Sequence, residues 1–109
     1  MTPTRTLLVL LAAFVAPSLF AADAAAIWKK QCAECHGKDG RGDTKIGRKR
    51  YISDLTNPEL QAKFSDEQAA HSIKFGLKDA KGNVIMEPAR RVSDQEVEAL
   101  VAYVRTLKK

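Results

Sequence analysis

The pattern of apolar and polar positions predicts a chain of short helices separated by irregular segments. Near the C-terminus, apolar residues recur every three or four positions and form one stripe at helical spacing: Val97, Leu100, Val101 and Val104. Ser93 and Glu96 just before this stripe have the spacing of a capping box. We therefore expect a helix that begins after Ser93 and buries this stripe.

The same kind of pattern predicts a helix in the middle of the chain. Ser65 and Gln68 have capping-box spacing, and Gly76 is a suitable C-terminal end. His71 lies about 200° around the helix from Ile73 at 100° per residue, so it is expected to point to solvent. The apolar face is expected to contain Ala69, Ala70, Ile73 and Leu77.

Two more helices are predicted in the first half of the chain. Residues 24–31 are rich in alanine, and Asn57 followed by Pro58 is a favourable helix start. The segments 37–51 and 78–91 contain turn-forming glycines and are expected to be loops. No segment has the pattern of a convincing β-strand, so the predicted fold class is all-α.

The first 21 residues have the pattern of an export signal. Arg5 is the only charged residue among them, and Leu7 to Val15 is an apolar run of nine residues. Small residues follow, and cleavage is expected after Ala21 or Ala24, which leaves residues 22–109 as one domain. An uncleaved membrane anchor is the alternative, but the run is shorter than the roughly 18 residues that a spanning helix needs.

The five residues from Cys32 to His36 carry the chemistry that points to a function. Their sequence, Cys-Ala-Glu-Cys-His, has the spacing of covalent c-type haem attachment. Helix positions i, i+3 and i+4 share a face, so two thiols can bond to one porphyrin edge while an imidazole reaches the iron. Cys32 and Cys35 are therefore the candidate thioether residues, and His36 is a candidate iron ligand.

Three other interpretations of this motif explain less. A thioredoxin-like Cys-x-x-Cys pair is expected to follow a strand, and none is predicted before Cys32. A structural zinc site needs four ligands, whereas outside the motif the chain has no cysteine and only one histidine, His71. A plain disulfide between Cys32 and Cys35 would leave His36 without a role. Covalent haem accounts for all three motif residues.

Met86 is the candidate for a second iron ligand. It is the only methionine that remains after removal of the signal segment, and it lies between apolar residues in a loop bounded by Gly82 and Pro88. The alternatives are His71, which is expected to face solvent, and an empty sixth position. An empty position would suit a haem enzyme or a gas sensor, whereas two filled positions suit an electron carrier.

Charge excludes some partners and leaves others open. The chain has 18 basic and 13 acidic residues and a formal net charge of +5. This excess is mild, and the sequence does not contain the strong basic stripe of a nucleic-acid-binding protein. One basic cluster is interpreted either as a solvated loop or as a surface near haem propionates or an acidic partner: Lys45, Arg48, Lys49 and Arg50.

Taken together, these residues resemble the small class I cytochromes c, which are monohaem electron carriers of the bacterial periplasm. The similarity covers nearly all of residues 22–109. It rests on Ile27-Trp28 before the Cys32–His36 motif, on the isolated Met86, and on the segment 93–105. The resemblance implies the cytochrome c fold, with about four helices around one covalent haem c and with the first and last helices packed crosswise.

The resemblance also implies the roles of the site residues and the kind of partner. Cys32 and Cys35 become thioether positions, and His36 and Met86 become the axial ligands, with no catalytic residue. The implied protein is a periplasmic monomer without stable membrane insertion or nucleic-acid partner, and it serves redox proteins with acidic docking surfaces. One departure is that the family often has a proline soon after the motif, whose carbonyl orients the histidine, and this chain has none before Pro58.

Overall fold

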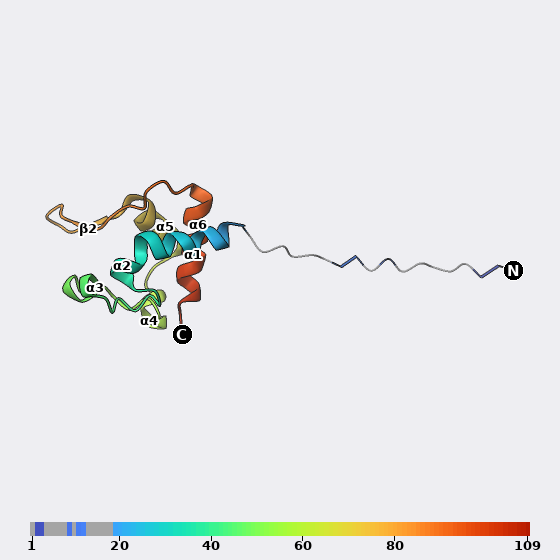
Figure 1. The fold of residues 1–109 in the computed structure, drawn as a ribbon, viewed down its shortest axis with the longest axis horizontal. Helices are drawn as coiled ribbons and strands as arrows, with labels where there is room; N and C mark the ends of the chain where they lie inside the picture. Colours follow the sequence, from blue (N-terminus) through green and yellow to red (C-terminus); the bar gives the residue numbers. More distant parts are fainter. Residues whose placement is uncertain (1, 4–8, 10, 13–18) are drawn as a thin grey trace.

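The computed structural model describes residues 2–3, 9, 11–12 and 19–109, so most of the expected signal segment lies outside the described residues. The described residues form helices and one small hairpin (Figure 1). None of the described helices is long and apolar enough to cross a membrane. The elements in chain order are α1 (Leu19–Ile27), η1 (Trp28–Cys32), α2 (Ala33–His36), α3 (Lys45–Lys49), α4 (Pro58–Gln61), α5 (Asp66–Phe75), β1 (Leu77–Lys78), β2 (Val84–Met86) and α6 (Asp94–Thr106).

The first three elements form one continuous helical segment that ends with the Cys32–His36 motif. Its middle part, η1, is a π-helical turn in which the N–H of Ala33 donates to the carbonyl of Trp28, five residues earlier. Gly37, with φ of 83°, ends the segment. The helix predicted over residues 24–31 is confirmed, but it begins earlier and contains a π-turn that no sequence pattern indicates.

Both predicted capping boxes are present. The hydroxyl of Ser65 accepts a hydrogen bond of 3.1 Å from the N–H of Gln68, whose side chain accepts one of 2.9 Å from the N–H of Ser65. Ser93 and Glu96 make the same pair at the start of α6. The start of α4 after Asn57 is also confirmed, because the Asn57 side chain caps the helix. These helix starts follow from local sequence alone.

The core lies where α1 crosses α6 (Figure 1). The predicted stripe of α6 is buried along its whole length, and Leu100 is 1% exposed. Each fully buried side chain of this size contributes about 1.5–3 kcal/mol relative to an exposed one. Tyr103 packs against this core from its edge. The buried residues of the core cluster are Ala24, Ile73, Val97, Leu100 and Val101.

The expected loop over residues 37–51 contains a short helix, α3, so that prediction is wrong for residues 45–49. The hydroxyl of Thr44 caps this helix, because it accepts a hydrogen bond of 2.8 Å from the N–H of Gly47. The same hydroxyl donates to the carbonyl of Cys35 at 3.1 Å. The helix therefore depends on contact with the motif as well as on its own cap.

The expected loop over residues 78–91 contains most of an antiparallel hairpin, so the prediction of no strand is also wrong. The carboxylate of Asp79 closes the hairpin by accepting a hydrogen bond of 2.9 Å from the N–H of Asn83. Leu77 was expected on the apolar face of α5, but α5 ends before it. Leu77 lies in β1 instead, opposite Met86 on β2.

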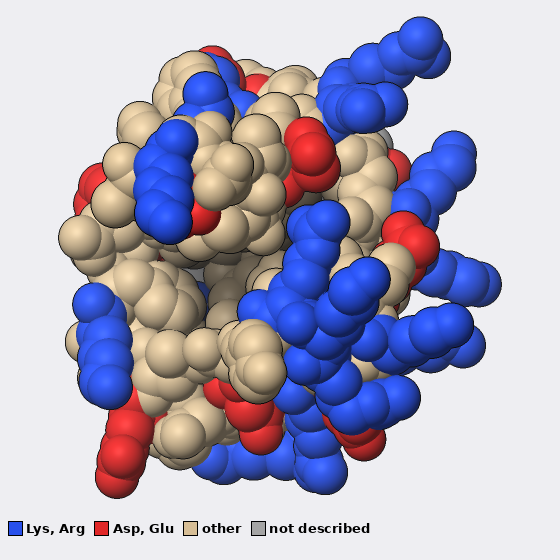
Figure 2. Space-filling model, turned by 90° about the vertical axis from the view of Figure 1, so that its left-hand side faces the viewer, with Lys and Arg blue, Asp and Glu red and all other residues tan. Residues whose placement is uncertain are grey.

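Basic side chains gather along one side of the face that carries α3, beside a hollow in the surface (Figure 2). Arg48 is paired with Asp43. Just after α3 comes Tyr51, whose side chain is 92% exposed and whose backbone has a left-handed φ of 56°. The exposed basic residues of α3 and its C-terminal end are Lys45, Arg48, Lys49 and Arg50.

Candidate functional site

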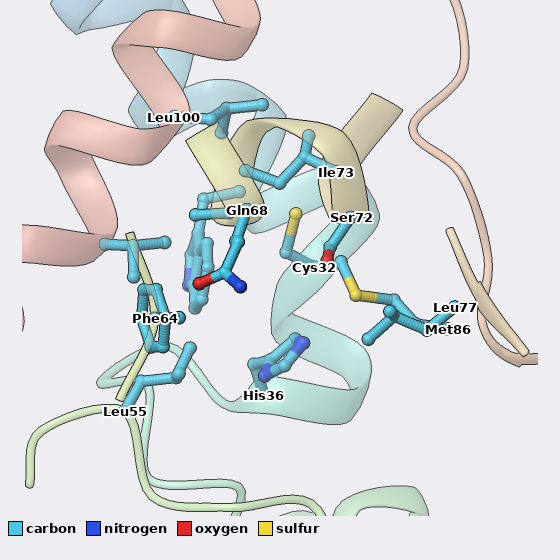
Figure 3. Close-up of a pocket in the computed structure, with 13 residues that line it drawn as sticks. Cys32, His36, Leu55, Phe64, Gln68, Ser72, Ile73, Leu77, Met86 and Leu100 are labelled. Carbon is cyan, nitrogen blue, oxygen red and sulfur yellow. The ribbon is translucent and has the colours of Figure 1, made fainter. Parts of the chain in front are cut away.

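An apolar cavity of about 290 Å³ separates the Cys32–His36 motif from the hairpin (Figure 3). Its walls come from the first helical segment, the chain before and within α5, the hairpin and α6. Three of the four candidate site residues, Cys32, His36 and Met86, line it, and Cys35 is half-buried nearby. The remaining lining residues are Trp28, Leu55, Phe64, Gln68, Ala69, Ser72, Ile73, Leu77, Leu100 and Val104.

The two cysteines are free, half-buried thiols. Burial, together with the neighbouring Cys35, raises the pKa of the Cys32 thiol to about 11. Cys32 is therefore protonated at neutral pH, whereas thiol–disulfide exchange requires a thiolate. This environment argues against a thiol redox protein, and it places the Cys32 thiol at the edge of an apolar cavity.

His36 is held beside the cavity without a hydrogen bond at Nδ1, which is buried. The missing partner agrees with the absence of a proline carbonyl soon after the motif. Burial lowers the pKa of His36, so its imidazole is held in the neutral form that binds metals. Instead of a hydrogen bond, the ring of Trp28 packs against it, with 5.6 Å between the ring centroids.

The backbone around the motif is packed too closely for most side chains. The N–H of Gly42 donates to the carbonyl of His36 at 2.7 Å. Gly47 is buried against this turn, and a Cβ added there would collide with the carbonyl oxygens of Gly42 and Cys35. These glycines therefore allow α3 to lie directly against the motif, which fixes the backbone that carries His36.

Met86 and His71 have opposite environments. Met86 is half-buried on β2, and its side chain faces the same cavity as His36 (Figure 3). His71 is exposed on α5, as predicted, and its ring lies 4.8 Å from that of Phe75 between centroids. His71 is not among the residues that line the cavity. The described structure thus brings His36 together with Met86 and leaves His71 outside.

Gln61 and Arg105 form hydrogen bonds with the part of the cavity wall that lies opposite the hairpin. Neither residue was predicted from the sequence. Gln61 is 3% exposed and donates to the carbonyls of Leu55 and Val104, each at 2.8 Å. Arg105 donates to the carbonyls of Gln61 at 2.6 Å and Phe64 at 2.8 Å. A buried glutamine in a four-residue helix has no local signal, because glutamine is mostly exposed in proteins.

A zinc site receives no support from the described part of the chain. There, no group of three or more histidine, cysteine, aspartate and glutamate side chains could hold a metal ion. The His36 imidazole, the Met86 thioether and the Cys32 thiol line the cavity instead, and the second thiol belongs to Cys35 in the same motif. Imidazole and thioether are the axial ligands of cytochrome haems, and two thiols at this spacing are the attachment points of haem c.

Comparison with known proteins identifies the family. The family model for cytochrome c matches residues 21–108. The chain belongs to the cytochrome c family. This cytochrome is 28% identical over 93 residues to cytochrome c-553 of Helicobacter pylori (strain ATCC 700392 / 26695), and the match covers 85% of this chain and 86% of that protein.

Solved structures agree with this assignment. The c-type cytochrome KustC0563 is 32% identical and superposes with a TM-score of 0.66 over 79% of this chain and 98% of that one. A point mutant of the same protein gives a TM-score of 0.64 at 32% identity, over 79% and 99% of the two chains. The cytochrome c fold expected from the sequence is therefore confirmed, with a small hairpin added to its helices.

The family determines the cofactor and the class of activity. Its members carry electrons and are not enzymes, and they bind one haem c covalently through a pair of cysteines. Cys32 and Cys35 have the spacing of that pair. The residues present fit such a group, because the cavity is apolar, the free thiol of Cys32 lines it and the side chain of His36 lines it as well.

Proposed function

We propose that this cytochrome is a soluble periplasmic carrier of single electrons whose haem iron is bound by His36 and Met86. The observation that carries the proposal is that these two residues, from α2 and β2, face one apolar cavity (Figure 3). With both His36 and Met86 bound to it, the iron would have no position for a substrate and would supply only a change of oxidation state. This is the behaviour of a carrier.

The protein's own residues support this role in two ways. The lowered pKa of His36 keeps its imidazole neutral and available as a ligand. The apolar lining excludes water and disfavours additional charge inside the cavity. Thioether ligation and burial both raise the reduction potential of a haem. The side chains around the cavity therefore favour the reduced state of the haem iron.

Exchange of Met86 for alanine tests the ligand assignment, with the same change at His71 as the control. Met86→Ala is expected to give high-spin iron, to admit cyanide or carbon monoxide, and to lower the reduction potential. His71→Ala is expected to leave the absorption spectrum unchanged, because His71 is outside the cavity. High-spin iron in His71→Ala together with an unchanged Met86→Ala spectrum would show that the assignment is wrong.

Export to the periplasm is proposed from the N-terminal pattern and from the thiol pair, since haem-linked and oxidised cysteines are typical of proteins outside the cytoplasm. Of the two expected cleavage points, the one after Ala21 is favoured. Ala24 is 1% exposed in the core, so cleavage after Ala24 would remove a residue that α6 packs against. Mass spectrometry of the periplasmic protein determines the new N-terminus.

The basic cluster of α3 is proposed as a docking surface for an acidic redox partner. Its charges lie on one exposed face beside a hollow (Figure 2), and Tyr51 adds an exposed aromatic ring next to them. Electrostatic docking of a monomer predicts that electron transfer slows as salt rises. Charge reversal in either of two single variants, Lys45→Glu or Lys49→Glu, should weaken this salt dependence. The single variant Lys108→Glu changes the net charge by the same amount outside the basic cluster, and it is the control.

A further inference from the structure

The residue just before the motif, Gln31, is joined to the other side of the cavity by a reciprocal pair of hydrogen bonds. Its Nε2 donates to the carbonyl of Arg90 at 2.9 Å, and the N–H of Arg90 donates to its Oε1 at 2.8 Å. A side-chain amide offers both a donor and an acceptor, so Gln31 satisfies both main-chain groups of one residue. The contact resembles one rung of a β-ladder.

This pair acts on the segment that carries Met86. Arg90 lies between β2 and α6, shortly after Met86. One main-chain hydrogen bond also holds this segment, from the N–H of Ala89 to the carbonyl of Ile73 at 2.8 Å. Pro88 has no N–H to contribute. Apart from its pairing with Leu77 in the hairpin, the position of Met86 therefore depends on two neighbouring anchors, one to α5 and one to Gln31.

The hairpin itself offers little support. Val84 and Ile85 on β2 are 43% and 47% exposed, and Leu77 on β1 is 42% exposed. No atom lies within 4 Å of a Cβ built at Gly82, in the turn. With so few packed contacts, the hairpin is held in place mainly at its ends.

The backbone just beyond the contact is strained. Arg91 has a left-handed φ of 54°, which is unfavourable for a residue with a side chain. Such a conformation persists only where the surrounding contacts determine it. The two hydrogen bonds at Arg90, the neighbouring residue, are contacts that restrain this backbone.

We propose that Gln31 is a positioning residue that keeps Met86 over the cavity by holding the segment around Arg90. This inference rests on the proposed function, in which Met86 binds the iron. Gln31 precedes Cys32, one of the two haem attachment residues, so the attachment side of the site restrains the ligand on its other side. Loss of the two hydrogen bonds lets the segment open more often, and Met86 then leaves the iron more often.

The experiment uses the haem-loaded protein with the variants Gln31→Leu and Gln31→Glu. Leucine keeps the approximate size but makes neither hydrogen bond, whereas ionised glutamate accepts from Arg90 but cannot donate. Gln95→Leu, an exposed position in the first turn of α6, is the matched control. Two measurements are made: the rate of cyanide binding to the ferric protein, and amide hydrogen exchange of Arg90 in the ferrous protein.

Gln31→Leu is expected to raise both rates roughly tenfold, as the loss of two exposed hydrogen bonds implies. Gln31→Glu is expected to give a smaller rise, and Gln95→Leu none. An unchanged rate of amide hydrogen exchange at Arg90 in Gln31→Leu would show that Gln31 does not hold this segment. Faster Arg90 exchange with an unchanged cyanide rate would overturn the positioning role, because opening would then leave Met86 in place.

Met86→Ala separates this inference from the proposed function. If Met86 binds the iron, the unmodified protein takes up cyanide more slowly than Met86→Ala does. Equal rates in these two proteins would show that Met86 is not a ligand, and the proposed function would fail. Arg90 exchange in Gln31→Leu would then decide by itself whether Gln31 holds the segment.

Discussion

The indole nitrogen of Trp28 donates a hydrogen bond of 3.0 Å to the carbonyl of Gly37, so the segments before and after the Cys32–His36 motif are joined to each other. Trp28 is 4% exposed, and its ring also packs against Tyr103, with 5.4 Å between centroids. One side chain thus joins the haem attachment motif to α6.

Trp28→Phe is expected to lower the free energy of unfolding of the haem-loaded protein by at least about 2 kcal/mol, because the buried carbonyl of Gly37 loses its donor and the core loses part of the indole ring. Chemical denaturation measures the change. Tyr103→Phe keeps the aromatic contact and is the control, with an expected loss well below that of Trp28→Phe. Equal losses would mean that the hydrogen bond contributes little.

Replacing the cysteines is expected to remove covalent haem stepwise. Cys32→Ala and Cys35→Ala should each retain at most one thioether bond, and the double variant should retain none. Mass spectrometry of the denatured protein, matured in the periplasm, detects the haem adduct. The yield of folded protein should fall in the same order, because haem completes the core. A native protein without covalent haem would contradict the assignment.

Gly47→Ala is expected to disrupt the motif, because its Cβ would collide with the carbonyl oxygens of Gly42 and Cys35. Haem incorporation and thermal stability should both fall sharply. Gly82→Ala is the matched control, since open space surrounds Gly82 and only its left-handed φ of 84° is disfavoured. That strain costs about 1 kcal/mol. Similar losses in both variants would show that space at Gly47 is not limiting.

The haem-free chain is expected to lack a sharp thermal transition. At about 24 cal/mol per Å³, an unfilled cavity of about 290 Å³ costs on the order of 7 kcal/mol as an upper limit. That is comparable to the whole stability of a small domain. Calorimetry of the double cysteine variant without haem tests this, with the haem-loaded protein for comparison. A cooperative transition without haem would contradict it.

The hairpin turn is expected to weaken in acid. Hydrogen bonds from the backbone and then the side chain of Asn83 lower the pKa of Asp79 below its ordinary value of 3.8. Because the folded-state pKa is the lower one, this contribution to stability is present above pH 3.8 and disappears as the pH falls through the folded-state value. NMR titration of the carboxyl carbons measures the pKa.

Asn83→Ala should raise the pKa of Asp79 part of the way towards 3.8, because the backbone donor remains. The pKa of Asp54 is lowered by hydrogen bonds from Thr56 instead, so it should not change in this variant. An unchanged pKa of Asp79 in Asn83→Ala would mean that the side-chain hydrogen bond of Asn83 does not lower that pKa.

Local patterns predicted the elements whose causes are local. The boxes at Ser65 and Ser93 satisfy helix ends with side chains three residues away, so sequence alone places α5 and α6. The Cys32–His36 motif is likewise recognised locally, from the spacing of its residues on one helical turn. Met86 was predicted by elimination rather than by pattern, and the fold brings it to the cavity that His36 lines.

Elements that depend on distant contacts were missed. The Thr44 cap of α3 also donates to the carbonyl of Cys35, and the glycines that looked like loop residues permit this approach. The hairpin is too short for a strand pattern and depends on Asp79. The partner of Gln31 lies 59 positions away in the chain, which no window of local sequence can reveal.

The π-helical turn from Trp28 to Cys32 sets how α1 is oriented relative to the Cys32–His36 motif, because it takes up one residue more than an α-turn. If the same residues formed regular α-helix, the extra residue would turn α1 by about 100° relative to the cysteines. Ala24 would then no longer pack against α6, although the motif itself would be intact. An engineer who transplants the motif into another helix must therefore carry the five-residue turn with it, or redesign the opposite face of that helix.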